Sequence, residues 1–493
     1  MALKIGWGQC SITPNRPVMM AGQFYTRISE KVQNPVTATV MAIESEGAGQ
    51  SDRLLLISCD LVAISDSMRT AARQAISRML PCIQPENIVL NATHTHTAPD
   101  VRVREDMNSP GGGNGPSPEE ILKLLDEPIM TPAEYIAFAA ENIALASREA
   151  WDARTPCGIG YGLGQALVGR NRRACYLSGE CRMYGKTGDP TFSHIEGDED
   201  HGVNVLAVWN RERELTGVIV NVACPAQDTE HLFEISADFW HETRVMLRQR
   251  LGPDIFILPQ CSAAGDQSPH ALLNKAAEER MLRLQRRTNR EEIGERLAAT
   301  VCAILPALET EIEWNPVFAH ACETVQLVRR NLTEQDVADA LVAAAPFRQA
   351  YNEELEHLAA HPEKKQEPRW YVAVTHAFRK VVWNESVESR FKRQQAQPHV
   401  SVELHLLRLG DVAIATNPFE YYLDFGQRIK ARSPAIQTFL VQLAGSGTYL
   451  PTFRAIQGKS YGAVAASTPV GPEGGQEIVE WTLKQLGEMF TAE

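Results

Sequence analysis

The sequence has no cluster of basic residues and no long apolar run. Its 48 Lys and Arg are outnumbered by 61 Asp and Glu, and the two signs are mixed along the chain. Nucleic acids and anionic membranes are bound by clustered Lys and Arg, so we expect neither as a partner. No run approaches the roughly 18 apolar residues of a transmembrane helix, and the N-terminus lacks a signal-peptide pattern. We therefore predict a cytoplasmic protein that does not insert into membranes.

Closely spaced cysteine pairs are also absent. The ten cysteines include no Cys-x-x-Cys motif, and the nearest two, Cys175 and Cys181, are six residues apart. This spacing matches no common metal or redox motif. We therefore predict free, buried thiols, as is typical of a reducing cytoplasm.

Short apolar runs alternate with helical patterns along much of the chain. The runs are almost continuously apolar, which is typical of strands buried on both faces. They span Leu54–Asp60, Asn87–Thr93, Asn204–Asn210, Thr216–Ala223 and Asp254–Gln260. Helical patterns span Asp66–Met79, Pro132–Trp151 and Phe239–Leu251. The alternation predicts an α/β fold with mixed, buried β-sheets flanked by helices.

The chain is long enough for one very large domain, with 493 residues of which 44% are hydrophobic. We predict a single domain over residues 1–493 with a helical insertion over residues 333–398, where helical pattern and dense charge replace the strands. Strand character returns in His399–Thr416. The Gly- and Pro-rich stretch Ser109–Pro118 is expected to be a loop, either a lid over a nearby site or a plain surface loop.

Two histidines stand where one predicted strand ends. His94 and His96 occur in the sequence Asn-Ala-Thr-His-Thr-His-Thr-Ala-Pro, directly after Ile88-Val89-Leu90. In an extended chain, side chains two residues apart point the same way, so both imidazoles can converge on one ion or one substrate. The alternative is that each imidazole bonds to nearby backbone. Ligands of open α/β sheets bind outside the carboxyl ends of strands, which favours a functional role.

Three further segments contain candidate polar residues. Two of them follow a predicted strand, and the third lies in a Gly-rich region. After the strand Asp254–Gln260, a turn carries Asp266, Ser268 and His270, and Ser268 is a potential nucleophile if a base or metal activates it. The same composition is common in ordinary turns. Glu420 follows the strand that ends near Thr416, and the Gly-rich region beyond it contains Tyr449 and Tyr461.

Asp238 and His241 add polar side chains in Ser236–Arg244. With Arg244 they fall on one face of a predicted helix, so they can take part in a site that binds a carboxylate. The alternative is that Asp238 is an ordinary acid that caps the helix N-terminus.

Placed in order, these segments resemble the catalytic domain of the neutral (non-lysosomal) ceramidase family. Thr93–Pro99 is similar to the family's Thr-His-Thr-His-Ser-Gly-Pro signature, and Gly-Asp-Gln-Ser-Pro-His to its Gly-Asp-Val-Ser-Pro-Asn nucleophile motif. Asn-Pro-Phe-Glu resembles its Gly-Glu-Phe segment, and the two tyrosines fit its Tyr-Val-Thr-Thr segment with a second tyrosine further on. Gly169–Arg173 loosely resembles its Asn-Arg-Ser-Pro element.

The resemblance implies a division of roles among these residues. His94, Glu420 and Tyr449 would be ligands of a divalent metal, most often Zn²⁺, and His96 would be a catalytic group beside it. Ser268 would be the nucleophile, while Arg172 and Tyr461 would bind the substrate or a developing oxyanion. We assign Asp266, His270, Asp238 and His241 to substrate binding.

One metal ligand of the family is missing. Where its second zinc histidine should fall, this chain has Cys224 and Pro225, and proline has no ligating side chain. Among Cys224, Gln227, Asp228 and His231 we favour His231 as the replacement, because imidazole suits zinc better than an amide oxygen. The alternative is that His231 lies in a surface loop. We expect no counterpart of the family's C-terminal immunoglobulin-like domain after Tyr461.

The sequence therefore predicts a metal-dependent hydrolase that acts on an amide, ester or lactone in a soluble polar small molecule, carboxylated or sugar-like. A metal-dependent carbohydrate lyase or epimerase is the alternative, since the same groups can stabilise an enolate. A non-catalytic metal-binding relative is a third hypothesis, prompted by the missing histidine. The oligomeric state, including a homo-oligomer, is left open.

Overall fold

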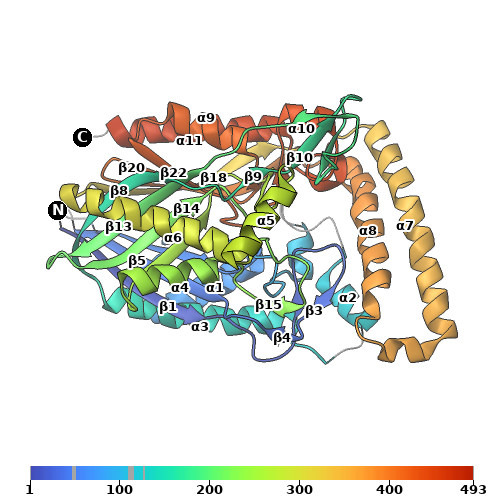
Figure 1. The fold of residues 1–493 in the computed structure, drawn as a ribbon, viewed down its shortest axis with the longest axis horizontal. Coiled ribbons are helices and arrows are strands. Elements are labelled where there is room, and N and C mark those ends of the chain that lie inside the picture. Colours follow the sequence, from blue (N-terminus) through green and yellow to red (C-terminus); the bar gives the residue numbers. More distant parts are fainter. Residues whose placement is uncertain (1, 47–50, 109–115, 126–127, 492–493) are drawn as a thin grey trace.

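Two β-sheets pack face to face, and helices cover the outer face of each (Figure 1). The structure is a computed structural model, and we describe residues 2–46, 51–108, 116–125 and 128–491. Most of the predicted Gly-rich loop, residues 109–115, lies outside these ranges. The result is a four-layer arrangement of helices, sheet, sheet and helices.

The larger sheet has eight strands among the described residues. Its order is β16-β14-β13-β8-β1-β5-β6-β7, with parallel pairs at both edges, β14–β16 and β6–β7, and antiparallel pairs between them. The strands are β1 (Ala2–Ser11), β5 (Thr37–Glu46), β6 (Ser51–Cys59), β7 (Ile88–Ala92), β8 (Thr155–Gln165), β13 (Gly202–Asn210), β14 (Leu215–Val222) and β16 (Phe256–Cys261).

The smaller sheet has four strands in the order β18-β19-β20-β22. They are β18 (Phe318–Val328), β19 (His399–Leu409), β20 (Val412–Thr416) and β22 (Gln437–Val441). Gly410 turns the chain between β19 and β20 with a φ of +58°, a conformation that glycine adopts without strain. The predicted strand His399–Thr416 is therefore two antiparallel strands.

The strands of the larger sheet are apolar on both faces because helices cover one face and the smaller sheet covers the other. Along β6, Leu55 and Ile57 pack toward the helices α1 (Asp66–Met79) and α3 (Pro132–Asp152), whereas Leu54 and Leu56 pack against Leu407 and other residues of the smaller sheet. Successive side chains of a strand point to opposite faces, so both faces must be apolar here. The prediction of strands buried on both faces is confirmed, and so is the α/β class with mixed sheets.

Helices cover the outer faces of the sheets, and some have clear start signals. Thr131 and Glu134 form a reciprocal capping box at the start of α3, and Ser65 caps α1. The larger sheet is covered by α1 (Asp66–Met79), α3 (Pro132–Asp152), α4 (Phe239–Leu251) and α6 (Asn289–Leu308), and the smaller by α9 (Leu423–Arg432) and α11 (Pro472–Thr491). Among the described residues, no helix has the length and apolar character needed to cross a membrane.

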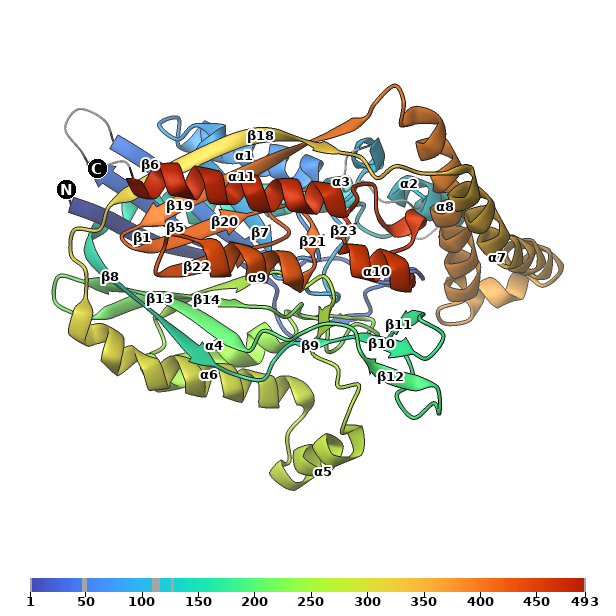
Figure 2. The same ribbon diagram turned by 90° about the horizontal axis from the view of Figure 1, so that it is seen from above.

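A helical hairpin lies at the end of the molecule away from both termini (Figures 1 and 2). It consists of α7 (Glu334–Ala360) and α8 (Tyr371–Arg393), which fall within residues 333–398. Helix α8 contacts the body directly, since the backbone N–H of Thr26 donates to the Thr375 hydroxyl at 3.1 Å. That these helices are an insertion into one large domain stays a prediction.

The remaining elements are shorter. The strands are β2 (Met19–Met20), β3 (Arg27–Ile28), β4 (Lys31–Val32), β9 (Arg170–Asn171), β10 (Arg173–Tyr176), β11 (Cys181–Met183), β12 (Phe192–Ile195), β15 (Glu234–Ile235), β17 (Gln267–Ser268), β21 (Glu420–Tyr421) and β23 (Tyr449–Leu450). The helices are α2 (Pro118–Leu125), α5 (Lys275–Gln285) and α10 (Phe453–Gly458).

One pair of cysteines departs from the prediction of free thiols. Cys175 and Cys181 are directly opposite each other in the β10–β11 hairpin, with Cα atoms 4.1 Å apart, and they form a disulfide. Their sequence spacing gave no sign of this, because the hairpin register, not the spacing, places the two side chains together. The other eight cysteines are free. The cytoplasmic location stays a prediction.

The disulfide can be tested by counting thiols. We expect an alkylating reagent to modify eight cysteines in denatured, unreduced protein and ten after reduction, as measured by intact mass. Modification of all ten without a reductant would contradict the disulfide.

Candidate active site

Strand ends bring the main candidate residues together. His94 and His96 follow β7, and Glu420 and Tyr449 belong to β21 and β23. In the parallel β21–β23 pair, Glu420 is directly opposite Tyr449. Residues more than 300 positions apart in the sequence thus become neighbours through strand order, as expected at the carboxyl ends of strands.

These residues line a cavity of about 210 Å³. Of the residues singled out in the sequence, His94, His96, Glu420, Tyr449 and Tyr461 form part of its wall. Phe24, Arg102, Arg379 and Trp383 also line it, and none of these four was predicted. The helix α8 supplies the last two of them.

The His94 imidazole has a fixed orientation. Its Nδ1 lies 2.6 Å from the backbone oxygen of Val62, and its Nε2 lies 3.4 Å from Glu420 Oε2. A carbonyl oxygen only accepts, so Nδ1 carries the proton and the Nε2 lone pair faces the cavity. His94 has a φ of +64°, a conformation uncommon for residues other than glycine and typical of functional positions.

His96 is oriented by a carboxylate and a glycine. Its Nδ1 lies 3.2 Å from Glu230 Oε2, which favours a proton on that nitrogen. On the other side, a Cβ at Gly22 would lie 2.7 Å from His96 Cγ, so this close packing requires glycine. The buried His96 imidazole has a lowered pKa, chiefly because of desolvation, which the Glu230 carboxylate opposes.

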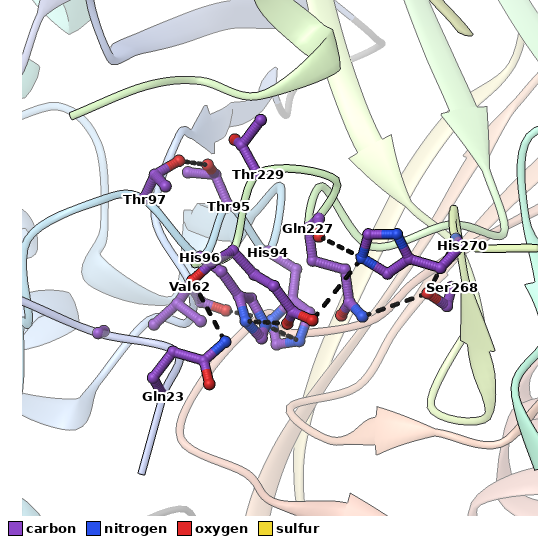
Figure 3. Close-up of polar contacts among 12 residues, drawn as sticks. Gln23, Val62, His94, Thr95, His96, Thr97, Gln227, Thr229, Ser268 and His270 are labelled. Atoms are coloured by element: carbon purple, nitrogen blue, oxygen red, sulfur yellow. Dashed lines mark hydrogen bonds and ion pairs between the residues drawn. The ribbon is translucent and has the colours of Figure 1, made fainter. Parts of the chain in front are cut away.

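The two histidines present their free nitrogens to each other. The Nε2 atoms of His94 and His96 are 3.3 Å apart (Figure 3). With both protons on the Nδ1 atoms, two lone pairs face across this gap and repel unless a cation is beside them. A metal ion bound to His94 meets this requirement.

The donors around His94 fit such an ion. Adjacent ligands of a tetrahedral zinc with bonds of about 2.0–2.1 Å are about 3.3–3.4 Å apart, and His94 Nε2 and Glu420 Oε2 are separated by 3.4 Å. Tyr449 is directly opposite Glu420 in the β21–β23 pair and also lines the cavity, so it lies beside the same point. The Nδ1–H bond from His94 to a backbone carbonyl is typical of zinc-binding histidines.

The structure does not bring His231 to this site. His231 is exposed and does not line the cavity, so its predicted role as a metal ligand is not supported. Cys224 is fully buried and its Sγ points to the Pro225 carbonyl, and burial raises the pKa of its thiol far above the ordinary value. Neither Cys224 nor His231 lines the cavity in which His94 and Glu420 lie.

Two other groups of potential metal ligands lie outside the cavity in the described part of the chain. In one, Cys175 and Cys181 are joined in the disulfide, and Glu196 is paired with Arg173. The other comprises Cys322, Glu403 and His405 on β18 and β19. In the latter group Arg73 donates to both oxygens of Glu403, at 2.7 and 3.0 Å.

Glu230, the residue before His231, joins two histidines. Its carboxylate lies 3.2 Å from His96 Nδ1 and 3.7 Å from His270 Nε2. Burial alone would raise its pKa, but the contacts with His270 and His96 lower it well below the ordinary range. Burial lowers the pKa of His270, but Glu230 and Asp228 raise it by more, so the net shift is upward. His270 therefore acts on the carboxylate rather than on the cavity.

Ser268 lies behind the cavity wall. The side chain is fully buried and does not line the cavity. Its Oγ is approached by three donors: the Tyr184 hydroxyl at 3.2 Å, the His270 backbone N–H at 3.1 Å and the Gln227 amide at 3.4 Å. Figure 3 shows the contact with Gln227. No histidine ring nitrogen of the described residues is hydrogen-bonded to it.

Arg172 is also held behind the wall. Its guanidinium donates to the Tyr449 hydroxyl at 3.2 Å and to the Gly265 carbonyl at 2.9 Å, and lies 3.9 Å from Glu420 Oε2. Burial lowers the pKa of this arginine, but the neighbouring Tyr449, Tyr184 and Glu420 raise it overall. Arg172 therefore orients Tyr449 and balances the charge of Glu420, rather than facing the cavity.

Three residues assigned to substrate binding have other partners. Asp266 accepts from Asn171 at 3.0 Å and from the backbone of Leu423 at 2.9 Å, and burial raises its pKa to about 6. Asp238 caps α4 and accepts from Thr229, which is the alternative stated above. His241 lies on α4 and does not line the cavity, so the structure does not bring it to the site.

Tyr461 is placed on the wall by a buried ion pair. Arg173, fully buried, pairs with Glu196 at 2.6 Å and also donates to the backbone oxygens of Lys459 and Tyr461 at 2.8 and 3.4 Å. The Tyr461 ring contacts Tyr449 edge to face, with centroids 5.2 Å apart. Burial raises its pKa, so the phenol keeps its proton and can donate it in a hydrogen bond.

Solved structures with the same arrangement are known. A ceramidase complexed with C2 has a TM-score of 0.66 and 14% identity, covering 99% of this chain and 75% of that one. The neutral ceramidase from Pseudomonas aeruginosa has a TM-score of 0.66 and 16% identity, covering 99% and 74%. This chain has the neutral ceramidase fold. No protein-family model and no curated protein sequence matches it.

The resemblance to neutral ceramidases is thus confirmed at the level of the fold, with low sequence identity as expected of a divergent relative. The likeness extends over nearly the whole chain, which includes every segment on which the resemblance was based. The roles of the individual site residues stay predictions.

The metal site can be tested by affinity. We expect one Zn²⁺ per chain in a competition titration with a chelator, and a more than tenfold weaker affinity in His94→Ala and Glu420→Ala, because each loses a ligand. His231→Ala, an exposed neighbour, is the control and should bind as the wild type does. Equal weakening in the control, or no binding by the wild type, would contradict the assignment.

Proposed function

We propose that the chain is a metal-dependent hydrolase that cleaves an amide, ester or lactone bond in a small polar molecule. The observation that supports this best is the position of His96. It lines the cavity, its Nδ1 lies 3.2 Å from the Glu230 carboxylate, and its Nε2 lies beside the donors suited to a metal. The similar structures are ceramidases, which favours cleavage of an amide bond.

His94, Glu420 and Tyr449 would hold the metal. When bound, a zinc ion polarises a carbonyl and makes a bound water more acidic, which favours attack on that carbonyl near neutral pH. Arg172 supports this set by donating to Tyr449 and facing Glu420. With one imidazole, one carboxylate and one phenol, the set has one histidine fewer than the resemblance implies.

His96 and Tyr461 would move or hold protons. The contact with Glu230 keeps the proton of His96 on Nδ1, so its Nε2 accepts a proton from the attacking water and passes it to the leaving group. Glu230 then stabilises the imidazolium, as the carboxylate of a catalytic triad does. The Tyr461 hydroxyl would donate to the oxyanion from the cavity wall.

We propose water rather than Ser268 as the nucleophile. Ser268 is fully buried, does not line the cavity and is hydrogen-bonded to groups that hold Arg172. Its role would be to fix Tyr184 and Gln227 behind the wall.

The cavity volume favours a small substrate. About 210 Å³ is below the 300–1,000 Å³ of sites for drug-sized ligands, and a lipid with two long tails needs more room.

A lyase or epimerase is the second candidate. The observation that favours it is that Ser268 does not line the cavity, whereas His96 and Tyr461 do and could move a proton at carbon. The two reactions differ in their use of water. In H₂¹⁸O, hydrolysis places one ¹⁸O in the product acid, whereas elimination or epimerisation places none there.

The general-base role can be tested by comparing two variants on a panel of small N-acyl amino acids, esters and lactones. We expect Glu230→Gln to lower kcat by about 10²–10⁴, because the imidazolium loses its carboxylate. Ser268→Ala should lower kcat by less than about tenfold. The reverse order of effects would contradict water as the nucleophile and restore Ser268 to that role.

A further inference from the structure

We propose that Arg379, from the helical hairpin, binds a carboxylate of the substrate. Arg379 lies on α8 and lines the cavity, and only 9% of its surface is exposed. The inference rests on the proposed function in that the cavity is taken as the substrate site. It goes further by naming the charged group that the substrate carries.

The Arg379 guanidinium has no counter-ion in the described chain. No described carboxylate lies within 4.0 Å of it, its Nε has no hydrogen-bond partner, and its Nη2 has only long contacts, 3.5 Å to Thr26 Oγ1 and 3.6 Å to Met19 Sδ. A buried charge without a partner is costly, and such a charge is normally paired. An anion that enters the cavity would supply the missing partner.

The surroundings of Arg379 contain an excess of positive charge. Asp100 is nearby, but Arg102 donates to both of its oxygens, at 2.9 and 2.6 Å. Arg27 is fully buried and donates to backbone carbonyls only, including those of His96 and Leu232. Lys380 places its Nζ 3.3 Å from the centre of the Phe24 ring. Asp100, the carboxylate that acts on Arg379, is therefore already matched by Arg102.

The pKa shifts agree with this excess. Burial, together with Arg102 and Arg27, lowers the pKa of Arg379 to about 10, against which Asp100 acts only in part. Burial lowers the pKa of Arg27 to about 10 and that of Lys380 to about 8. Each cation is thus less stable here than in water, and an incoming anion would relieve the repulsion.

The shape of the cavity wall suggests how the substrate lies. His94, His96 and Glu420 provide the reacting groups, whereas Arg379 and the Trp383 ring come from α8. Trp383 packs against Phe24 and Tyr461, with ring centroids 5.2 and 5.8 Å apart. A substrate would place its carboxylate at Arg379, where a planar guanidinium can bind both oxygens, and its scissile bond at the histidines.

The test measures binding without turnover. Full-length protein treated with a chelator, so that no metal can hold a carboxylate, is titrated calorimetrically with N-acetylated amino acids and with the corresponding neutral amides, for example N-acetylglycine and N-acetylglycinamide. We expect carboxylates to bind at least about tenfold more tightly than their amides. No preference across the panel would overturn the proposal.

Two variants assign the preference to the residue. Arg379→Met keeps the aliphatic volume and should abolish the preference, whereas Arg348→Met, which removes an exposed positive charge from α7, should keep it. A preference that persists in Arg379→Met would overturn the proposal. Should that variant fail to fold, Arg379→Gln is measured in its place.

Stability gives an independent readout. Because the methionine variant removes an unpaired buried charge, its unfolding temperature should equal or exceed that of the wild type. A clear fall would indicate a structural arginine and count against the proposal. If the protein hydrolyses none of the tested bonds yet prefers carboxylates through Arg379, the proposed reaction fails and the anion site stands. If it hydrolyses one of these bonds without preferring carboxylates, the anion site fails and the proposed reaction stands.

Discussion

The site depends on the orientation of two imidazoles whose free nitrogens lie 3.3 Å apart. The backbone oxygen of Val62 binds Nδ1 of one ring, and the Glu230 carboxylate lies 3.2 Å from Nδ1 of the other. With protons on these outer nitrogens, lone pairs occupy the inner ones. Such a pair is unfavourable alone and favourable beside a cation, so the fold prepares this point for a positive charge before any ligand arrives.

The charged groups near the two histidines are paired, whereas one farther along the cavity wall is not. Glu420 and Glu230 face the imidazoles, and Arg172 lies behind Glu420, so the anionic groups near the reacting centre have partners inside the protein. Farther along the wall, Arg379 is a positive charge without a carboxylate partner among the described residues. A neutral two-tailed lipid would make no use of that charge. Under the proposal made above, the helical hairpin would supply the charge that binds the carboxylate of the substrate.

The parts of the site that could be predicted from the sequence are those that local pattern determines. His94, His96 and Glu420 each come after an apolar strand, a position where α/β proteins bind ligands, so a role for them in one site was foreseeable. Burial on both faces was equally visible in runs such as Leu54–Asp60. The mixed strand directions were expected only in outline, because pairing across the long sheet depends on residues far apart in the sequence.

The parts that were missed depend on tertiary packing. Glu230 lies in a loop without periodicity. Its neighbour His231 was predicted to be a metal ligand because of its imidazole, although the side chain is exposed. Ser268 occupies a turn of the expected composition, yet Tyr184 and Gln227 cover it. Arg379 is one of many charges on a helix, and only the docking of α8 turns it into the cavity. No residue-level pattern encodes that docking.

A metal held in the cavity by nitrogen and oxygen donors would be seen by X-ray absorption spectroscopy of the zinc-loaded protein. We expect a first shell of N and O atoms at about 2.0–2.1 Å, with an outer-shell imidazole signal that disappears in His94→Ala. A sulfur scatterer at about 2.3 Å, as expected if zinc bound the group that contains Cys322, or an imidazole signal unchanged in His94→Ala, would contradict it.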